Sequence, residues 1–268
     1  MDKGSVLEID REVVNVNPFD DKTTIKVMTS EPSAGLVDCQ VFDNRIDFYM
    51  ELARLESRSK FKFFTGNTGR MSVNYAREAM ATAAIEQGMD YILMMDDDQI
   101  VPRDMFERLY ATAIKHDAQM VSPMVTQRFH PFWPVMWKHS FDDTKKAISC
   151  DFISEYEPNA VVEADAIGFG VVLIKVDVIK KVKAPRFFSN THLGEDIFFC
   201  MKAKGEAKAK IVMDTSIKVG HLRPPQLATE YDFVKAKGLE KKFDSVYGHM
   251  KQVDNIDTLN KETQKVVK

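Results

Sequence analysis

Blocks of apolar residues alternate with polar segments through the first hundred residues, and their spacing predicts secondary structure. We expect strands at 24–29, 60–65 and 91–95, where β-branched, aromatic or continuous apolar residues dominate. Apolar residues at helical spacing predict helices over 43–55 and 73–86. Strands that alternate with helices in this way indicate an α/β fold with a mostly parallel central sheet flanked by helices.

The second half of the chain has a less regular pattern. A helix is expected over 102–116 and a strand over 119–123. The segment 128–137 is dense in prolines and aromatic rings, which excludes a regular helix, and its rings either join the core or line a pocket. The further expected elements are strands at 148–153, 161–165, 167–175, 210–213 and 217–219, and helices at 176–182 and from 195 onward.

The chain after residue 225 differs from what precedes it. From residue 226 the pattern is helical and rich in lysine, with no further strand expected. Such a lysine-rich face is either solvated or docks an acceptor, a partner chain or an anionic surface. We therefore predict an α/β domain over 1–225 and a helical C-terminal extension over 226–268.

The most informative stretch is the apolar run 91–95, which ends in three adjacent carboxylates, Asp96, Asp97 and Asp98. A run of this kind is typical of a strand buried on both faces, and open α/β sheets bind ligands at the carboxyl ends of their strands. If the backbone stays extended, Asp96 and Asp98 point to one side and Asp97 to the other. Three neighbouring acids repel one another unless a cation lies among them, so the stretch is either a metal site or a solvated acidic turn.

Composition excludes some classes of protein. The 268 residues are 44% hydrophobic and 29% charged, with a formal net charge of -3, so there is no general electrostatic case for nucleic-acid binding. The three cysteines are far apart and have no metal-ligand spacing, which favours reduced thiols. No signal peptide or membrane span is evident, so we expect a soluble, cytoplasmic protein.

Several enzyme classes that use strand-end acids need further motifs. A P-loop is absent, because the nearest candidate, 66–70, has neither the spacing nor the lysine. A dinucleotide-binding loop is also absent, because Gly168 and Gly170 lead into a strand and not into a helix. An aspartate-nucleophile phosphatase stays open, although the acidic cluster comes late in the chain for that class.

Glycosyl transfer from a nucleotide sugar fits the acids better. The diphosphate leaving group develops negative charge, which a bound Mn²⁺ or Mg²⁺ stabilises, and such hard cations take oxygen ligands. An inverting enzyme also needs a carboxylate base near the acceptor hydroxyl.

In four segments, taken in order, the chain resembles a glycosyltransferase of the GT-A fold, closest to the family 2 group. The likeness covers about residues 24–222. Each motif alone is a weak indicator of the family, whereas the order and spacing of all four together are more specific. The matching segments are the first strand with 29–32, the helix segment 74–78, the Asp-x-Asp strand 91–98, and an acceptor-side half made of 168–174, 194–200 and 219–221.

The resemblance implies roles for individual residues. Asp98 and Asp96 would contact a Mn²⁺ or Mg²⁺ ion, with His221 as a further metal ligand, and Asp97 would lie near the nucleotide ribose or the metal. Asp196, next to Glu195, would be the catalytic base. The residues expected to bind the nucleotide sugar are Thr29, Ser30, Glu31, Arg70, Asn74, Arg77, Asp96, Asp97, Gly168 and Gly170. Asn67 lies in the same loop as Arg70, which could reach the nucleotide, and Arg128 and Trp137 are candidate contacts of the sugar or the acceptor.

Each role has a plain structural alternative. Asp196 and Glu195 are also what a helix N-terminus selects to complement its dipole. His221 is equally consistent with a hydrogen-bonded core histidine, and as a metal ligand it would also suit retaining enzymes of the same fold. Arg77 either binds phosphate or forms a surface ion pair on its helix.

The sequence departs from the family pattern in two ways. The usual Pro-Thr-Tyr-Asn-type start is replaced by Met-Thr-Ser-Glu at 28–31, and the Gln-x-x-Arg-Trp element and membrane helices of processive synthases are absent. The resemblance therefore implies a non-processive transferase, with a UDP-sugar the favoured donor. The acceptor (a saccharide, a protein, a small molecule or a modified nucleic-acid base) and the oligomeric state stay open. The alternatives are a metal-dependent nucleotidyltransferase or phosphatase, or a non-catalytic nucleotide-sugar-binding module.

Overall fold

The computed structural model describes most of the chain between residues 24 and 246. None of the described helices combines the length and apolar character that a membrane crossing requires. The described residues are 24–33, 37–69, 71–142, 147–190, 193–223, 226–239, 241–243 and 246.

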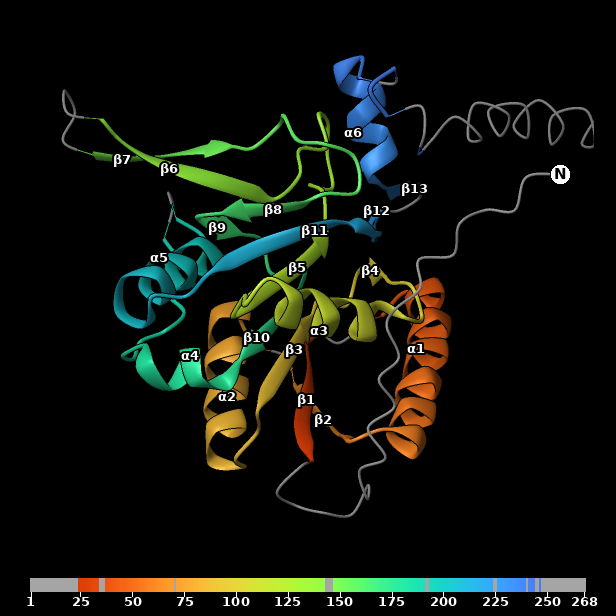
Figure 1. Cartoon of the computed structure of the whole chain (residues 1–268), viewed down its shortest axis with the longest axis vertical. Coiled ribbons are helices and arrows are strands. Elements are labelled where there is room, and N and C mark those ends of the chain that lie inside the picture. The colour runs from red at the N-terminus through yellow and green to blue at the C-terminus, as the bar shows by residue number, and fades with distance from the viewer. Residues whose placement is uncertain are drawn as a thin grey trace, which may run out of the picture.

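A seven-stranded sheet forms the centre of the described fold (Figure 1). Five of its strands run in one direction, and only β8 and β10 run the opposite way. The predicted α/β class with flanking helices is confirmed, and the sheet is mixed because β10 enters antiparallel between β3 and β5. In spatial order the strands are β2 (Phe61–Thr68), β1 (Ile25–Pro32), β3 (Tyr91–Met95), β10 (Val171–Lys175), β5 (Met120–Met124), β11 (Ile211–Lys218) and β8 (Val161–Ala164).

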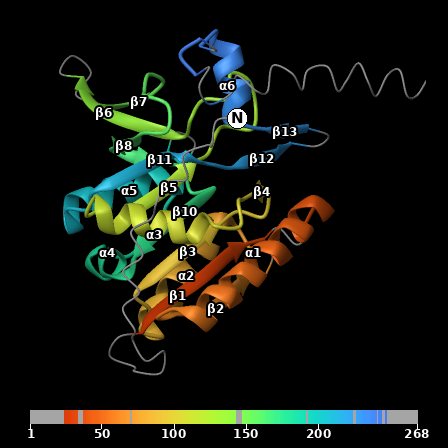
Figure 2. The ribbon, with the colours of Figure 1, turned by 45° about the vertical axis from the view of Figure 1, so that its right-hand side comes forward.

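Helices cover both faces of this sheet, and the period-2 alternation of strand side chains supplies a core to each. On β3, Leu93 and Met95 face α1 (Cys39–Arg58) and α3 (Met105–Lys115). Ile92 and Met94 face the opposite core, which contains α2 (Val73–Glu86), α4 (Val176–Lys181) and α5 (Glu195–Ala207). Figure 2 shows α1 running alongside β1 and β2. The continuous apolar run in β3 is thus explained by burial on both faces.

Local capping and burial explain where the helices begin and end. α2 matches its predicted span, and Gly88 follows it with a φ of 63°, a backbone conformation that favours glycine. α1 starts four residues earlier than predicted because Asp38 caps it, accepting a hydrogen bond from the Gln40 N–H at 2.8 Å.

Strands β1 and β2 continue beyond their predicted ends. Their parallel pairing extends to Pro32 opposite Thr68, beyond the predicted strand ends at 29 and 65. Backbone hydrogen bonds between the two strands stabilise this extension. The polar and turn-forming residues at 30–32 and 66–68 gave no sign of it in the sequence.

Two small sheets lie outside the central one. β6 (Met136–Asp142) pairs with β7 (Ala147–Phe152) and β9 (Ala166–Ile167), so the single strand predicted over 167–175 is wrong and splits into β9 and β10. β12 (Gly220–Arg223) pairs with β4 (Gln99–Ile100) and β13 (Gln226–Ala228). The two strands predicted at 210–213 and 217–219 are one strand, β11.

The described elements after residue 225, β13 and α6, pair with and pack against the rest of the fold. β13 contradicts the expectation of no further strand, and α6 (Glu230–Lys237) buries Phe233 and Val234 in the same core as α2 and α5. Buried Glu230 accepts a hydrogen bond from Tyr156 at 2.7 Å and forms an ion pair with Lys218 of β11. The division at residue 225 stays a prediction.

Candidate active site

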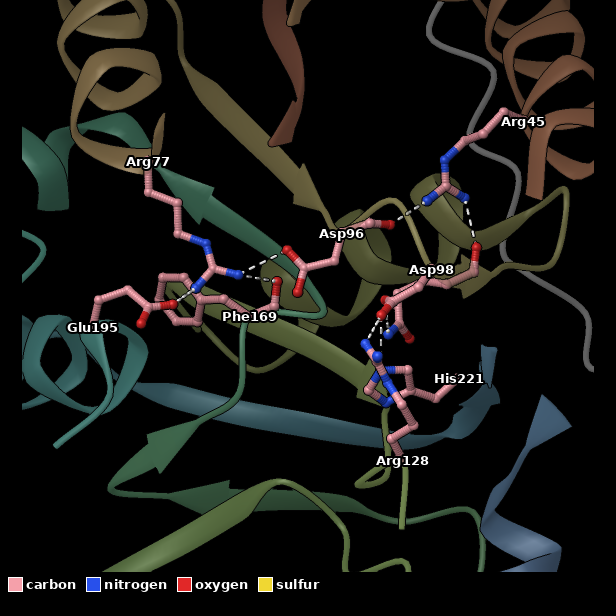
Figure 3. A network of polar contacts seen from close by, with 9 residues as sticks. Arg45, Arg77, Asp96, Asp98, Arg128, Phe169, Glu195 and His221 are labelled. Carbon is pink, nitrogen blue, oxygen red and sulfur yellow. Dashed lines mark hydrogen bonds and ion pairs between the residues drawn. The ribbon is translucent and has the colours of Figure 1, made fainter. Parts of the chain in front are cut away.

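The acidic stretch forms a turn at the carboxyl end of β3. The strand ends at Met95, and Asp97 and Asp98 lie in the turn that leads into β4, so the backbone does not stay extended through the three acids. Asp96 and Asp98 therefore engage different partners instead of pointing together (Figure 3). All three carboxylates line a cleft of about 250 Å³ together with Pro32, Ser33, Met71 and Val73.

Asp98 and His221 form the centre of this site. His221 Nε2 lies 3.2 Å from Asp98 Oδ2, and its Nδ1 lies 2.8 Å from the carbonyl oxygen of Thr126. The Thr126 carbonyl can only accept a hydrogen bond, so Nδ1 carries a proton and the ring is oriented with Nε2 toward the acidic turn. Burial opposes ionisation of Asp98, but His221 and the ion-paired guanidinium of Arg128 hold the pKa of Asp98 below its ordinary value.

The small sheet of β4 and β12 brings this histidine to the turn. His221 is aligned with Gln99, and the Leu222 N–H donates to the Asp98 carbonyl oxygen at 2.7 Å. His221 and Asp98 are 123 residues apart in the chain, so strand pairing and not local sequence sets their geometry.

Arg77 connects Asp96 to the start of α5. Its side chain is only 3% exposed; it donates to Asp96 at 2.8 Å and to Glu195, and to the Phe169 carbonyl oxygen at 3.2 Å. Burial alone would lower the pKa of Arg77, but Asp96, Glu195 and Asp196 raise it, so the guanidinium stays charged. Arg77 is therefore a buried bridge between two segments, which differs from both the phosphate contact and the surface ion pair considered above.

Asp196 lies in the first turn of α5, one residue after Glu195. Burial, followed by the neighbouring charge of Glu195, raises the pKa of Asp196 to about 6. The Ile197 N–H donates to Asp196 Oδ1 at 2.7 Å. A Cβ atom at Gly194 would stand 2.6 Å from this same oxygen, so the glycine leaves room for the carboxylate.

Two residues of α1 that sequence reasoning missed hold the acidic turn from the other side. Arg45 donates to the carbonyl oxygens of Asp96 at 2.8 Å and Gln99 at 3.0 Å (Figure 3). Asn44 exchanges two hydrogen bonds with the backbone of Val101, at 2.8 and 2.9 Å. A signal for Arg45 was present in the sequence, because it interrupts the otherwise apolar face formed by Val41, Phe48, Leu52 and Leu55.

The first strand contributes less surface than expected. Thr29 and Ser30 are fully buried in β1, so their side chains have no surface to offer a ligand in this structure. Glu31 is partly exposed and forms an ion pair with Arg45 at 3.2 Å, while the Tyr49 hydroxyl donates to it. Asn67, at the end of β2, lies with Glu31 in a second, larger pocket beside α1.

The remaining predicted residues have separate environments. Gly168 is a packing position, since a Cβ there would stand 2.7 Å from the Val135 side chain, and Gly170 approaches Val125 and Gln99 in the same way. Asn74 is partly buried in the first turn of α2. Trp137 is buried in the core, and Arg70 lies outside the described residues.

The donor set at the turn fits a divalent cation only in part. Among the residues that the structure describes, no three His, Cys, Asp or Glu side chains are grouped to hold a metal ion. Asp98 and His221 nevertheless supply a carboxylate and an oriented imidazole nitrogen at one point. Ligand oxygens and water would have to complete the shell, as is usual for Mg²⁺ bound with phosphates.

The fold of this chain is partly similar to the folds of several solved structures. No protein-family model and no curated protein matches the chain. Among solved structures, A197 from STIV is 20% identical with a TM-score of 0.47, over 74% of this chain and 86% of that one. A structure of GalNAc-T7 with UDP, GalNAc and Mn²⁺ is 13% identical with a TM-score of 0.43, over 85% of this chain and 50% of that one.

A third similarity is to UDP-glucose pyrophosphorylase, with or without UDP-glucose, at 7% identity and a TM-score of 0.44. It covers 82% of this chain and 98% or 99% of that one. At these levels of similarity no conclusion about activity follows, and the chemistry rests on the residues of the site.

Proposed function

We propose that this protein is a metal-dependent glycosyltransferase that moves a sugar from a nucleoside-diphosphate donor, with uridine favoured, to an acceptor hydroxyl with inversion. The observation that carries the proposal is the Asp98–His221 pair, in which Thr126 orients the histidine and Asp98 also lines the acidic cleft. Such a pair lies where open α/β sheets bind ligands, at the carboxyl end of β3.

On the donor side, Asp98 and His221 would hold the Mn²⁺ or Mg²⁺ ion. When bound, the cation neutralises negative charge that develops on the leaving diphosphate. Asp97 lies in the same cleft and is the proposed contact of the donor ribose. Arg45 and Asn44 keep the turn in position by binding its backbone.

On the acceptor side, Asp196 is the proposed base. A carboxylate with a pKa of about 6 is mostly ionised at neutral pH and is still more basic than an ordinary aspartate, which suits it to accept a hydroxyl proton. Glu195 is neutralised by Arg77, and this leaves Asp196 as the carboxylate of the pair that has no ion-pair partner among the described residues. Because Arg77 binds both Asp96 and Glu195, it fixes the donor half relative to the acceptor half.

Calorimetric titration with UDP- and GDP-sugars, with and without Mn²⁺, tests the proposal. We expect binding that depends on the metal, weakened more than about tenfold in Asp98→Asn. The matched control is Asp104→Asn, which alters an exposed aspartate paired with Arg108 and should leave binding unchanged. Absence of any metal-dependent nucleotide binding would refute the proposal.

Product analysis separates the proposal from its enzymatic alternatives. A glycosyltransferase releases the nucleoside diphosphate, whereas a nucleotidyltransferase releases pyrophosphate and a phosphatase releases phosphate. A non-catalytic module would bind donor and release none of these.

A further inference from the structure

Arg128 contacts both side chains that the proposed function assigns to the divalent cation. Its guanidinium forms an ion pair with Asp98 Oδ2, and its Nε lies 3.3 Å from His221 Nε2. Figure 3 shows all three side chains meeting at one point below the acidic turn. The two atoms that Arg128 contacts are the two donor atoms assigned to the divalent cation above.

Two cations cannot share this pair of ligands. A guanidinium at hydrogen-bonding distance repels an incoming divalent ion, and it also occupies the lone pairs that the ion would use. In the free protein, Arg128 compensates the negative charge of the partly buried Asp98 carboxylate. The metal would compensate the same charge in the complex.

The surroundings of Arg128 allow it to leave. Its side chain is 41% exposed and comes from the segment between β5 and β6, whereas the bridging Arg77 is 3% exposed and held by two carboxylates. An exposed guanidinium can exchange one anionic partner for another at little cost. Phosphate oxygens are a preferred alternative, because the planar guanidinium binds them in a bidentate manner.

We propose that Arg128 is a stand-in cation that couples metal binding to binding of the donor diphosphate; this rests on the proposed function. Without a diphosphate, Arg128 holds Asp98 and His221, and the divalent ion binds weakly. When the diphosphate enters the cleft, Arg128 moves to its oxygens and leaves Asp98 and His221 to the metal. By linkage, metal and diphosphate then strengthen each other's binding by the same factor.

Binding of Mn²⁺ alone, followed by electron paramagnetic resonance, is the direct test and needs no turnover. We expect Arg128→Gln to bind Mn²⁺ about tenfold more tightly than the wild type, within the usual range of coupling between sites. The gain in Mn²⁺ affinity caused by saturating UDP or GDP should shrink by a similar factor in this variant. The matched control is Arg103→Gln, which removes an equal charge from a 62% exposed arginine paired with Asp47, and it should behave as the wild type.

The double variant Asp98→Asn with Arg128→Gln locates the ion, because it should lose the gained affinity. Equal Mn²⁺ affinity in Arg128→Gln, Arg103→Gln and the wild type would overturn the inference while leaving metal-dependent nucleotide binding, and hence the proposed function, intact. A wild type that binds neither nucleotide with Mn²⁺ would overturn the proposed function, and the coupling would be overturned with it.

Discussion

Asp196 has an unusual environment for an aspartate. It lies at the start of α5, where a carboxylate is ordinarily stabilised, yet burial and the adjacent Glu195 raise its pKa to about 6. A group placed so that its ionised form is disfavoured reduces stability at neutral pH, which a purely structural capping residue would not do.

The pH dependence of transfer follows from this carboxylate. We expect kcat/KM to fall about tenfold per pH unit below pH 6, because the base must be ionised to accept a proton. Asp196→Asn should lower transfer by about 10²–10⁴-fold and leave the donor Kd unchanged, as measured by calorimetry and product assay. Glu206→Gln, at the other end of the same helix, is the control. Turnover that survives in Asp196→Asn would remove Asp196 from the role of base.

The same residue predicts a stability change of definite sign. Below about pH 4 the carboxyl group of Asp196 is neutral in both the folded and the unfolded state, so it has no effect on stability. Between about pH 4 and pH 6 the unfolded state ionises first, because the pKa is raised in the folded state, and the fold is increasingly destabilised. Above about pH 6 the destabilisation is complete. Asp196→Asn should therefore increase the free energy of unfolding at pH 8 by roughly 1–3 kcal/mol, with a smaller gain at pH 5. Urea denaturation at the two pH values measures this, and an equal effect at both would contradict it.

At the scale of elements, α1 acts as a clamp on the turn after β3. Arg45 and Asn44 bind backbone groups of Asp96, Gln99 and Val101, and Arg45 also neutralises Glu31 at the end of β1. The clamp joins the carboxyl ends of two neighbouring strands to one helix, so the position of the carboxylates depends on α1 as well as on β3.

Removing the clamp should destabilise the protein and loosen the turn. Arg45→Met loses the hydrogen bonds to the carbonyl oxygens of Asp96 and Gln99 and leaves Glu31 without its cation, which we expect to cost about 2–4 kcal/mol. Arg54→Met, on the exposed side of the same helix, should cost less than about 0.5 kcal/mol. Urea denaturation gives both values, and hydrogen exchange of residues 97–101 should rise only in Arg45→Met.

At the scale of the whole molecule, the two faces of the central sheet carry separate cores, and helix α6 adds to one of them. Phe233 of α6 is fully buried, with Trp133 and Tyr156 as aromatic neighbours at 5.9 and 6.4 Å between ring centroids. This helix is therefore part of the packing of the fold and not only an appended segment.

A substitution in α6 tests that statement. Phe233→Ala should lower the free energy of unfolding by about 3–5 kcal/mol, because it opens a cavity among rings that are held on other elements. Phe233→Leu, which keeps most of the volume, should cost less than about 1.5 kcal/mol. If the alanine variant unfolds like the wild type in urea, the segment is an independent extension.

The amino-acid sequence by itself determined the elements whose pattern is local. The helix over 73–86 and the buried strand over 91–95 could be predicted because the spacing of apolar residues reflects which face is covered. The acidic cluster and the Glu195–Asp196 pair could also be found, since unusual groups of carboxylates stand out at the ends of elements.

Only the tertiary structure decided how those carboxylates are used. Asp96 and Asp98 point in different directions because they bind different partners. Asp96 binds Arg77, whereas Asp98 binds Arg128 and His221. These partners come from segments that are far apart in the chain. The extension of β1 and β2, the splitting of β9 from β10, and the clamp by Arg45 likewise depend on pairing between distant segments. Such contacts leave no periodic pattern, because hydrogen bonds and ion pairs across the fold depend on where the chain returns and not on its local spacing.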